Sequence, residues 1–240
     1  MRKEHVLKFI LERNIDVLMV QELKGLDFPA DEFVANGLHT AALTQKAYNG
    51  VATFSKTPIT VIHDHLPGDQ SDDQARYLEF ETGGLRLINI YLPNGNPIGT
   101  DKFTYKLAWM QRLYERLKTL INENIPFAIG GDFNIIPEDI DCRDPKAWEG
   151  DALKHQDSIA AYRALLNLGL YDAYRIFSKL PEQYTFWDYQ AGAWQKNNGI
   201  RIDHFLLSPQ IADRIKNCEI DKTPRGWEKP SDHTPIIIEL

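Results

Sequence analysis

The sequence predicts an α/β fold in which two packed sheets are covered by helices. Apolar stretches of strand length alternate with stretches of helical periodicity along the whole chain. The chain has 240 residues, of which 43% are hydrophobic and 25% charged, so it can bury a substantial core. The pattern alone leaves a doubly wound fold open. The length favours a single domain over residues 1–240.

The first half of the chain predicts one helix followed by short strands. Apolar side chains share one helical face near the N-terminus, and later runs rich in Val, Ile and Thr are bounded by turn residues. The sequence Thr82-Gly83-Gly84 predicts a hairpin turn. We therefore expect a helix over residues 4–13 and strands over residues 17–20, 51–54, 59–62, 77–80 and 85–92.

The second half predicts two longer helices and three strands. Leucines at helical spacing over residues 102–122 predict the longest helix, and Gly169 ends a second helix over residues 158–168. A strand over residues 126–129 ends at a glycine pair. Strands over residues 200–207 and 236–240 complete the chain.

Charge and cysteine content exclude several classes of protein. The net charge is −7, which argues against a protein that coats nucleic acid by bulk electrostatics but not against a nucleic-acid enzyme with a local positive surface. No stretch approaches 18 consecutive apolar residues, so we expect no membrane span. Cys142 and Cys218 have neither the spacing of metal ligands nor that of a disulfide framework. A reducing, cytoplasmic setting is the simplest expectation.

Polar residues gather where the predicted strands end. They are Glu22, Tyr91, Asn94, Asp132, Asn134, Asp203, Asp232 and His233. Each alone has an ordinary structural explanation, since Asp and Asn also form turns and a Tyr can cover a core. Asp203 is different because it lies within an apolar strand, where an unpaired carboxylate is costly. Its expected partner is Arg201 or His233.

Together these residue types point to hydrolysis of a phosphate ester. Carboxylate and amide oxygens without a cysteine cluster suit a hard cation such as Mg²⁺ or Mn²⁺. A histidine beside a carboxylate suits proton transfer or orientation of water. Amide and phenol groups donate hydrogen bonds to phosphate oxygens as charge develops on them.

The chain resembles the exonuclease III and apurinic/apyrimidinic endonuclease group of the endonuclease/exonuclease/phosphatase superfamily. Five segments carry the resemblance, in the family order: residues 20–24 (VQELK), 91–95 (YLPNG), 131–134 (GDFN), 201–208 (RIDHFLLS) and 231–233 (SDH). GDFN and SDH are shared across the superfamily. The YLPNG segment and the Arg-Ile-Asp start of RIDHFLLS are more specific to its DNA-repair branch. The resemblance implies a DNase I-like, four-layer α/β sandwich of two mixed sheets flanked by helices.

The resemblance also implies roles for individual residues. Glu22 and Asp232 resemble metal-binding carboxylates, and Tyr91 resembles the tyrosine that contacts the scissile phosphate. Asp132 resembles the aspartate that activates water, beside a phosphate-binding asparagine, Asn134. Asp203 and His233 would form the remaining catalytic pair. Asn94 and Arg201 would bind the substrate.

An apolar pocket for a flipped-out abasic sugar is a further implication. Phe186, Trp187 and Ile202 match it, because a sugar without a base is small and apolar enough to enter. The alternative is that the aromatic side chains are ordinary core residues. Candidates for phosphate contacts are Lys24, Arg76, Lys106, Lys196 and Arg201.

The N-terminus departs from the family pattern. The resemblance implies a strand of roughly ten residues, ending in an Asn, ahead of the first helix, but here the helix begins almost at Met1. Loss of that strand would leave backbone groups unpaired and weaken the metal and phosphate site. We favour a misassigned start or an omitted segment over a truncated relative, because the other site residues are present.

The expected function is Mg²⁺-dependent cleavage of DNA 5′ to abasic sites, with trimming of 3′ ends. Its partner would be double-stranded DNA carrying abasic sites or blocked 3′ ends, bound by a monomer. Two alternatives stay open. One is another nuclease or phosphoesterase of the superfamily, and the other is a catalytically weakened protein that binds abasic DNA.

Overall fold

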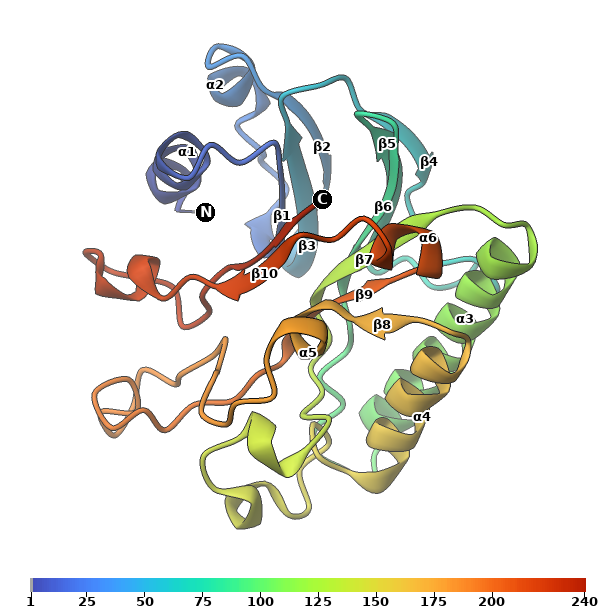
Figure 1. Cartoon of the computed structure of the whole chain (residues 1–240), viewed down its shortest axis with the longest axis vertical. Coiled ribbons are helices and arrows are strands. Elements are labelled where there is room, and N and C mark those ends of the chain that lie inside the picture. The colour runs from blue at the N-terminus through green and yellow to red at the C-terminus, as the bar shows by residue number, and fades with distance from the viewer. Residues whose placement is uncertain (1) are drawn as a thin grey trace. The chain divides into compact units, whose positions relative to one another are not determined.

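The computed structural model describes residues 2–240 of the chain (Figure 1). The chain divides into two compact units, the first formed by residues up to 91 with 125–131 and the second by residues 92–124 with 132–240. The expectation of a single domain stays a prediction. The predicted α/β class is confirmed, since β-sheets and helices build the structure together.

The first unit contains most of the strands. Its elements are α1 (Lys3–Glu12), β1 (Val17–Gly25), α2 (Ala30–Val34), β2 (His39–Leu43), β3 (Gln45–Ser55), β4 (Thr60–His63), β5 (Tyr77–Thr82), β6 (Leu85–Tyr91) and β7 (Phe127–Asp132), whose last residue belongs to the second unit. The strands form two groups, ordered β1-β3-β2 and β4-β5-β6-β7. The predicted hairpin is present, with Gly83 and Gly84 both at positive φ, as its two-residue turn requires.

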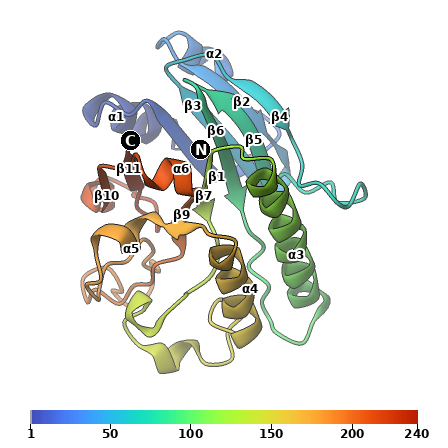
Figure 2. The ribbon, with the colours of Figure 1, turned by 45° about the vertical axis from the view of Figure 1, so that its right-hand side comes forward.

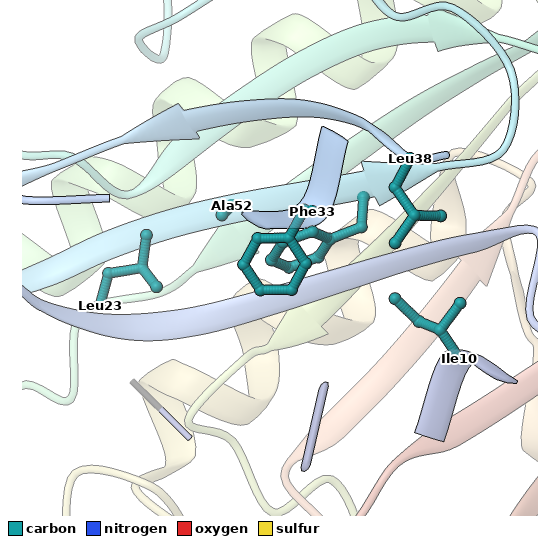
Figure 3. Packing of buried hydrophobic residues seen from close by; sticks show 6 residues of the cluster. Ile10, Leu23, Phe33, Leu38 and Ala52 are labelled. Atoms are coloured by element: carbon teal, nitrogen blue, oxygen red, sulfur yellow. The ribbon is translucent and has the colours of Figure 1, made fainter. Parts of the chain in front are cut away.

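Helices α1 and α2 cover the outer face of the β1-β3-β2 sheet. Figure 3 shows Ile10 of α1 and Phe33 of α2 in one apolar cluster with Leu23 and Ala52 of the strands, with Phe33 beside Ala52. These side chains are at most 5% exposed, so they form a sealed apolar layer. Burial of one such side chain contributes about 1.5–3 kcal/mol.

The inner faces of the two strand groups pack on each other. Asn89 of β6 is fully buried and donates to the carbonyl oxygens of Ala52 and Val20, at 2.9 and 3.3 Å, while its own oxygen accepts from Gln21 at 2.7 Å. A buried amide with all of these partners ties β6 to β3 and β1. The strand ends that carry Glu22 and Tyr91 are therefore fixed by their own sheets.

The second unit holds the longer helices. Its elements are α3 (Asp101–Asn122), α4 (Gln156–Asn167), β8 (Tyr171–Asp172), α5 (Ala173–Phe177), β9 (Asp203–Leu207), α6 (Pro209–Ala212), β10 (Asn217–Ile220) and β11 (Ile236–Glu239), with short 3₁₀ turns at Asp139–Asp141, Pro145–Trp148 and Thr223–Gly226. Strand β8 pairs with β9, and β10 with β11, both antiparallel. Helices α3 and α4 lie side by side in both views (Figures 1 and 2).

The helical predictions agree with the structure more closely than the strand predictions. The predicted helices over 4–13, 102–122 and 158–168 correspond to α1, α3 and α4 within two residues at each end. The strand predicted over residues 200–207 begins only at Asp203, because the amide of Arg201 donates to Asp141 instead of a strand neighbour. No helix within residues 2–240 is long and apolar enough to cross a bilayer.

Candidate active site

The end of β7 places Asp132 and Asn134 in contact. Gly131 precedes them with φ of 136°, and any Cβ there would collide with the carbonyl oxygen of Ile90, so only glycine allows this approach. The backbone N–H of Asn134 donates to Oδ1 of Asp132 at 2.8 Å, and its Nδ2 donates to Oδ2 at 3.0 Å. Both carboxylate oxygens of Asp132 are thus oriented by one asparagine.

A second amide extends this arrangement. Nδ2 of Asn94 donates to Oδ1 of Asn134 at 3.2 Å, and Asn94 is exposed, whereas Asn134 is 5% exposed. Nδ2 of Asn134 also donates to the carbonyl oxygen of Leu92 at 2.9 Å. Asp132, Asn134 and Asn94 therefore form a fixed polar row that ends at the surface of the second unit.

His233 is held by Asp203 in the same unit. Nδ1 of His233 lies 2.9 and 3.1 Å from the two carboxylate oxygens of Asp203, so His233, not Arg201, is the partner that Asp203 required. Burial lowers the pKa of His233, but the charge and hydrogen bond of Asp203, with Asp132 and Asp232 beyond, raise it to about 10. The side chain keeps 23% of its surface exposed, so solvent screens part of this effect.

Asp232 lies half-buried beside His233. Its carbonyl oxygen accepts from the backbone of Trp187 at 2.9 Å, which fixes the main chain and leaves the carboxylate at the surface of the unit. Ser231 Oγ lies 3.4 Å from Asp232 Oδ1 and also accepts from the N–H of His233 at 3.2 Å. The Ser-Asp-His segment is thus a rigid turn that carries both predicted functional side chains.

The first unit contributes Glu22 and Tyr91. Glu22 has φ of 60° at an irregularity where the pairing of β1 with β3 shifts, and its side chain is exposed. The hydroxyl of Tyr91 donates to Oε1 of Glu22 at 2.9 Å. The guanidinium of Arg76 stacks 4.8 Å from the Tyr91 ring and donates to its carbonyl oxygen at 3.1 Å. The sequence pattern did not predict this contact.

The predicted apolar pocket residues differ in exposure. Phe186 is half-buried, and its ring lies 5.0 Å from that of His233. Ile202 is 3% exposed and belongs to a core cluster with Ile200 and Leu153. Trp187 is 0% exposed, and its indole N–H donates to Asn197 at 3.2 Å, while its contact with substrate stays a prediction. Trp187 is a core residue of the loop.

Two predicted phosphate contacts are buried in the structure, and their contact with substrate stays a prediction. Arg201 is 1% exposed and is paired with Asp141 at 2.6 Å and Asp172 at 2.9 Å, so both carboxylates hold its guanidinium. These partners lie far from it in the chain, and no local pattern predicts them. Lys106 is 0% exposed and donates to three backbone carbonyl oxygens.

The predicted metal ligands fit a hard divalent cation by their chemistry. The carboxylates of Glu22 and Asp232 are at least partly exposed, and neither takes part in an ion pair within the described residues. Oxygen donors of this kind are what Mg²⁺ and Mn²⁺ take in proteins. Both cysteines are buried and free, which agrees with a site without thiolate ligands.

Comparison with known proteins gives consistent matches over nearly the whole chain. Residues 1–233 match the Endonuclease/Exonuclease/phosphatase family. The Exodeoxyribonuclease III of Haemophilus influenzae is 33% identical, with 99% of this chain and 95% of that protein covered. A 3'-5' exonuclease (NExo) from Neisseria meningitidis has a TM-score of 0.96 at 35% identity, covering 100% of this chain and 94% of that one.

A second solved structure belongs to a differently named protein. It is an AP endonuclease from Archaeoglobus fulgidus, with a TM-score of 0.94 and 33% identity over 100% of this chain and 94% of that one. The predicted DNase I-like fold class is confirmed by these likenesses. The chain belongs to the endonuclease/exonuclease/phosphatase family, within its exonuclease III and apurinic/apyrimidinic endonuclease group of hydrolases.

Proposed function

We propose that the chain is a Mg²⁺-dependent DNA-repair phosphodiesterase that cleaves 5′ to abasic sites and trims 3′ ends. One observation carries the proposal: the second unit holds both a carboxylate–amide row, Asp132 with Asn134, and a carboxylate–imidazole pair, Asp203 with His233. The first supplies groups that orient water, and the second supplies a positive group for phosphate. Relatives named Exodeoxyribonuclease III and AP endonuclease support this choice.

In the proposed reaction Asp132 orients and activates the attacking water. Its two oxygens are held by Asn134, so the carboxylate cannot rotate away from the water. Asn94 would donate to a phosphate oxygen through the second hydrogen of its Nδ2. Asn134 and the Tyr91 hydroxyl would donate to the phosphate by exchanging a present partner, the Leu92 carbonyl oxygen and Glu22, for a phosphate oxygen. His233, oriented through Nδ1 by Asp203, would present its other ring nitrogen to the phosphate.

Glu22 and Asp232 are the proposed ligands of Mg²⁺. When bound, the ion would neutralise phosphate charge and stabilise the departing oxygen. Before substrate binds, the Tyr91 hydroxyl would fix the rotamer of Glu22, since it donates to Oε1. Mn²⁺ offers the same oxygen chemistry and would serve as a substitute.

Phe186 and Ile202 remain the proposed contacts for a base-free sugar. Phe186 offers a half-buried ring beside His233, and it packs against the apolar cluster that contains the buried Ile202. A nucleotide that has lost its base is extruded from the duplex most cheaply, which would give selectivity. We further propose a monomer acting in the cytoplasm, where free cysteines persist.

A second candidate restricts the reaction to 3′ ends. A Neisseria protein described as a 3' phosphatase (NExo), bound to a product DNA hairpin, has a TM-score of 0.95 and 34% identity to this chain, so 3′-end processing alone is a specific alternative. The same Asp132, Asn134 and His233 would serve a 3′-phosphate, because the bond broken is again a phosphate ester. A weakened relative that only binds abasic DNA is the remaining alternative.

The test uses two duplexes, one with an internal tetrahydrofuran abasic analogue and one with a 3′-phosphate. Mg²⁺-dependent incision of the first, leaving a 3′-hydroxyl, is the expected result, and Asp132→Ala should reduce its rate by about 10³-fold or more. Removal of the 3′-phosphate without incision would favour the second candidate. Binding without turnover would favour the weakened relative, and cleavage that persists in EDTA would refute the metal-dependent reaction.

A further inference from the structure

Lys106 of α3 is a buried cation that the proposed reaction does not use. Its side chain is 0% exposed, although lysine is rarely buried. Its Nζ donates to the carbonyl oxygens of Asn94 at 3.0 Å, Asn134 at 2.7 Å and Ala152 at 3.3 Å. Three loops of the second unit therefore meet at one ammonium group.

This hydrogen-bond set matches a protonated amine. An ammonium has three N–H donors, one for each carbonyl oxygen, whereas a neutral amine has two. Burial lowers the pKa of Lys106 to about 7, although Asp132 and Asp151 oppose this effect. An apolar side chain could fill the same volume without the cost of burying charge. The cation therefore has a use other than packing.

The glycine of the Asn94-Gly95 pair makes room for Lys106. A Cβ added at Gly95 would lie 2.6 Å from Cδ of Lys106, and Gly95 has φ of 88°, which disfavours other residues. The loop that carries Asn94 is thus shaped around the lysine stem. The Pro-Asn-Gly segment of the loop therefore packs directly around the side chain of Lys106 from the helix.

We infer that Lys106 is a positioning residue that holds the two phosphate-binding amides, Asn94 and Asn134, through their main-chain carbonyl oxygens. This rests on the proposed function, which places both amides on the phosphate. Nδ2 of Asn94 donates to Asn134, and Asn134 in turn holds both oxygens of Asp132. A shift of either main chain would therefore disturb the carboxylate that activates water.

The test compares Lys106→Met with Leu117→Ala. Methionine keeps the length of the stem but removes all three donors. Leu117 is a fully buried residue of the same helix and has no hydrogen bond to either amide, so its alanine variant controls for loss of stability. Both are assayed on the tetrahydrofuran duplex at a temperature where each is folded, with kcat and KM measured separately.

Lys106→Met should lower kcat by about 30-fold or more with KM changed by less than about threefold, because positioning matters most as charge develops on the phosphate. Leu117→Ala should keep kcat within about twofold at a comparable loss of Tm. The side-chain amide resonances of Asn94 and Asn134 in ¹H–¹⁵N spectra should move in Lys106→Met and stay in place in Leu117→Ala.

If Lys106→Met does not fold, Lys106→Gln takes its place, because glutamine keeps two donors on a shorter stem. Equal kcat values for the lysine variant and Leu117→Ala, or unmoved amide resonances, would overturn the inference while leaving the proposed function intact. A wild-type chain that does not cut the duplex at all would instead overturn the proposed function, and the inference with it.

Discussion

The imidazole of His233 and the carboxylate of Asp203, 30 positions apart in the chain, meet with Nδ1 only 2.9 Å from Oδ2. Asp203 is 7% exposed, so its charge acts in a poorly solvated place and bears strongly on the histidine. The pairing fixes which nitrogen faces the carboxylate.

Replacing Asp203→Asn should keep the shape of this pair and remove its charge. We expect kcat for the tetrahydrofuran duplex to fall by about 10²–10³-fold, since the imidazole loses the stabilisation of its charged form. Single-turnover kinetics at saturating enzyme isolate this step. Asp213→Asn, at an exposed position, is the matched control. A decrease of less than twofold in D203N would show that the pair is structural only.

Asn134 has two roles that can be tested separately: its side chain forms hydrogen bonds, and its backbone adopts a left-handed conformation. Its φ is 49°, a conformation that glycine adopts freely and alanine does not. Asn134→Gly should therefore lose about 10²-fold in kcat, whereas Asn134→Ala should lose similar activity and about 1 kcal/mol more in unfolding free energy than the glycine variant. Urea unfolding and steady-state kinetics on both variants test this. Equal stability of the two would mean that the backbone relaxes.

Much of the fold follows from local sequence. The hairpin at Gly83-Gly84 and the helix Asp101–Asn122 were predicted because turn residues and apolar spacing act over a few neighbours. The strand His39–Leu43 was not predicted, since its sequence HTAAL lacks strong alternation and has a single β-branched residue, Thr40. It is a strand because β3 offers it a pairing edge, which is a tertiary effect.

Some contacts of the site residues were predicted and others were not, because some of these contacts are formed by residues far away in the chain. Asp203 was recognised as needing a partner, because a carboxylate in an apolar strand is costly wherever that partner lies. The burial of Arg201 could not be foreseen, since Asp141 and Asp172 are 60 and 29 residues away and nothing nearby in sequence marks them. Phe186 and Trp187 are consecutive, so in extended backbone their side chains point to opposite sides, and Phe186 is the one whose ring lies against His233.

The buried position of Arg201 gives a prediction opposite to that of a phosphate contact. Arg201→Met leaves Asp141 and Asp172 buried without their cation, so we expect a loss of about 3–5 kcal/mol in unfolding free energy. At temperatures where the variant is folded, KM for the duplex should change by less than about threefold. Chemical denaturation and steady-state kinetics measure both. A rise in KM without loss of stability would restore Arg201 as a substrate contact.

Glu22 is expected to govern the requirement for metal. Glu22→Gln keeps an oxygen that accepts from the Tyr91 hydroxyl but removes the charge that attracts a cation. The Mg²⁺ concentration for half-maximal activity should rise by about tenfold or more, while activity at saturating Mg²⁺ partly recovers. Glu12→Gln, at an exposed position of α1, is the control. An unchanged Mg²⁺ dependence in E22Q would exclude Glu22 as a ligand.

His204 makes the stability of the second unit depend on pH. Burial and the neighbouring Arg201 lower the pKa of His204 to about 4, since Nη1 of Arg201 lies 2.9 Å from Nδ1 and leaves no room for a proton there. The folded-state pKa lies below the unfolded value of about 6.5, so the unfolded chain binds the extra proton. The contribution of His204 to stability is therefore complete above pH 6.5 and is lost as the pH falls toward 4.

His204→Gln removes this titration and should flatten the pH dependence. The unfolding free energy of the wild type should fall relative to that of the variant by about 3 kcal/mol between pH 6.5 and 4, because one pKa unit corresponds to about 1.4 kcal/mol. Urea unfolding at half-unit pH steps measures the difference in unfolding free energy between the wild type and the variant. The contributions of carboxylates that titrate in both proteins cancel in this difference. His39→Gln, at an exposed position, is the control. A constant difference between wild type and H204Q across this range would mean that His204 takes up its proton without opposing Arg201.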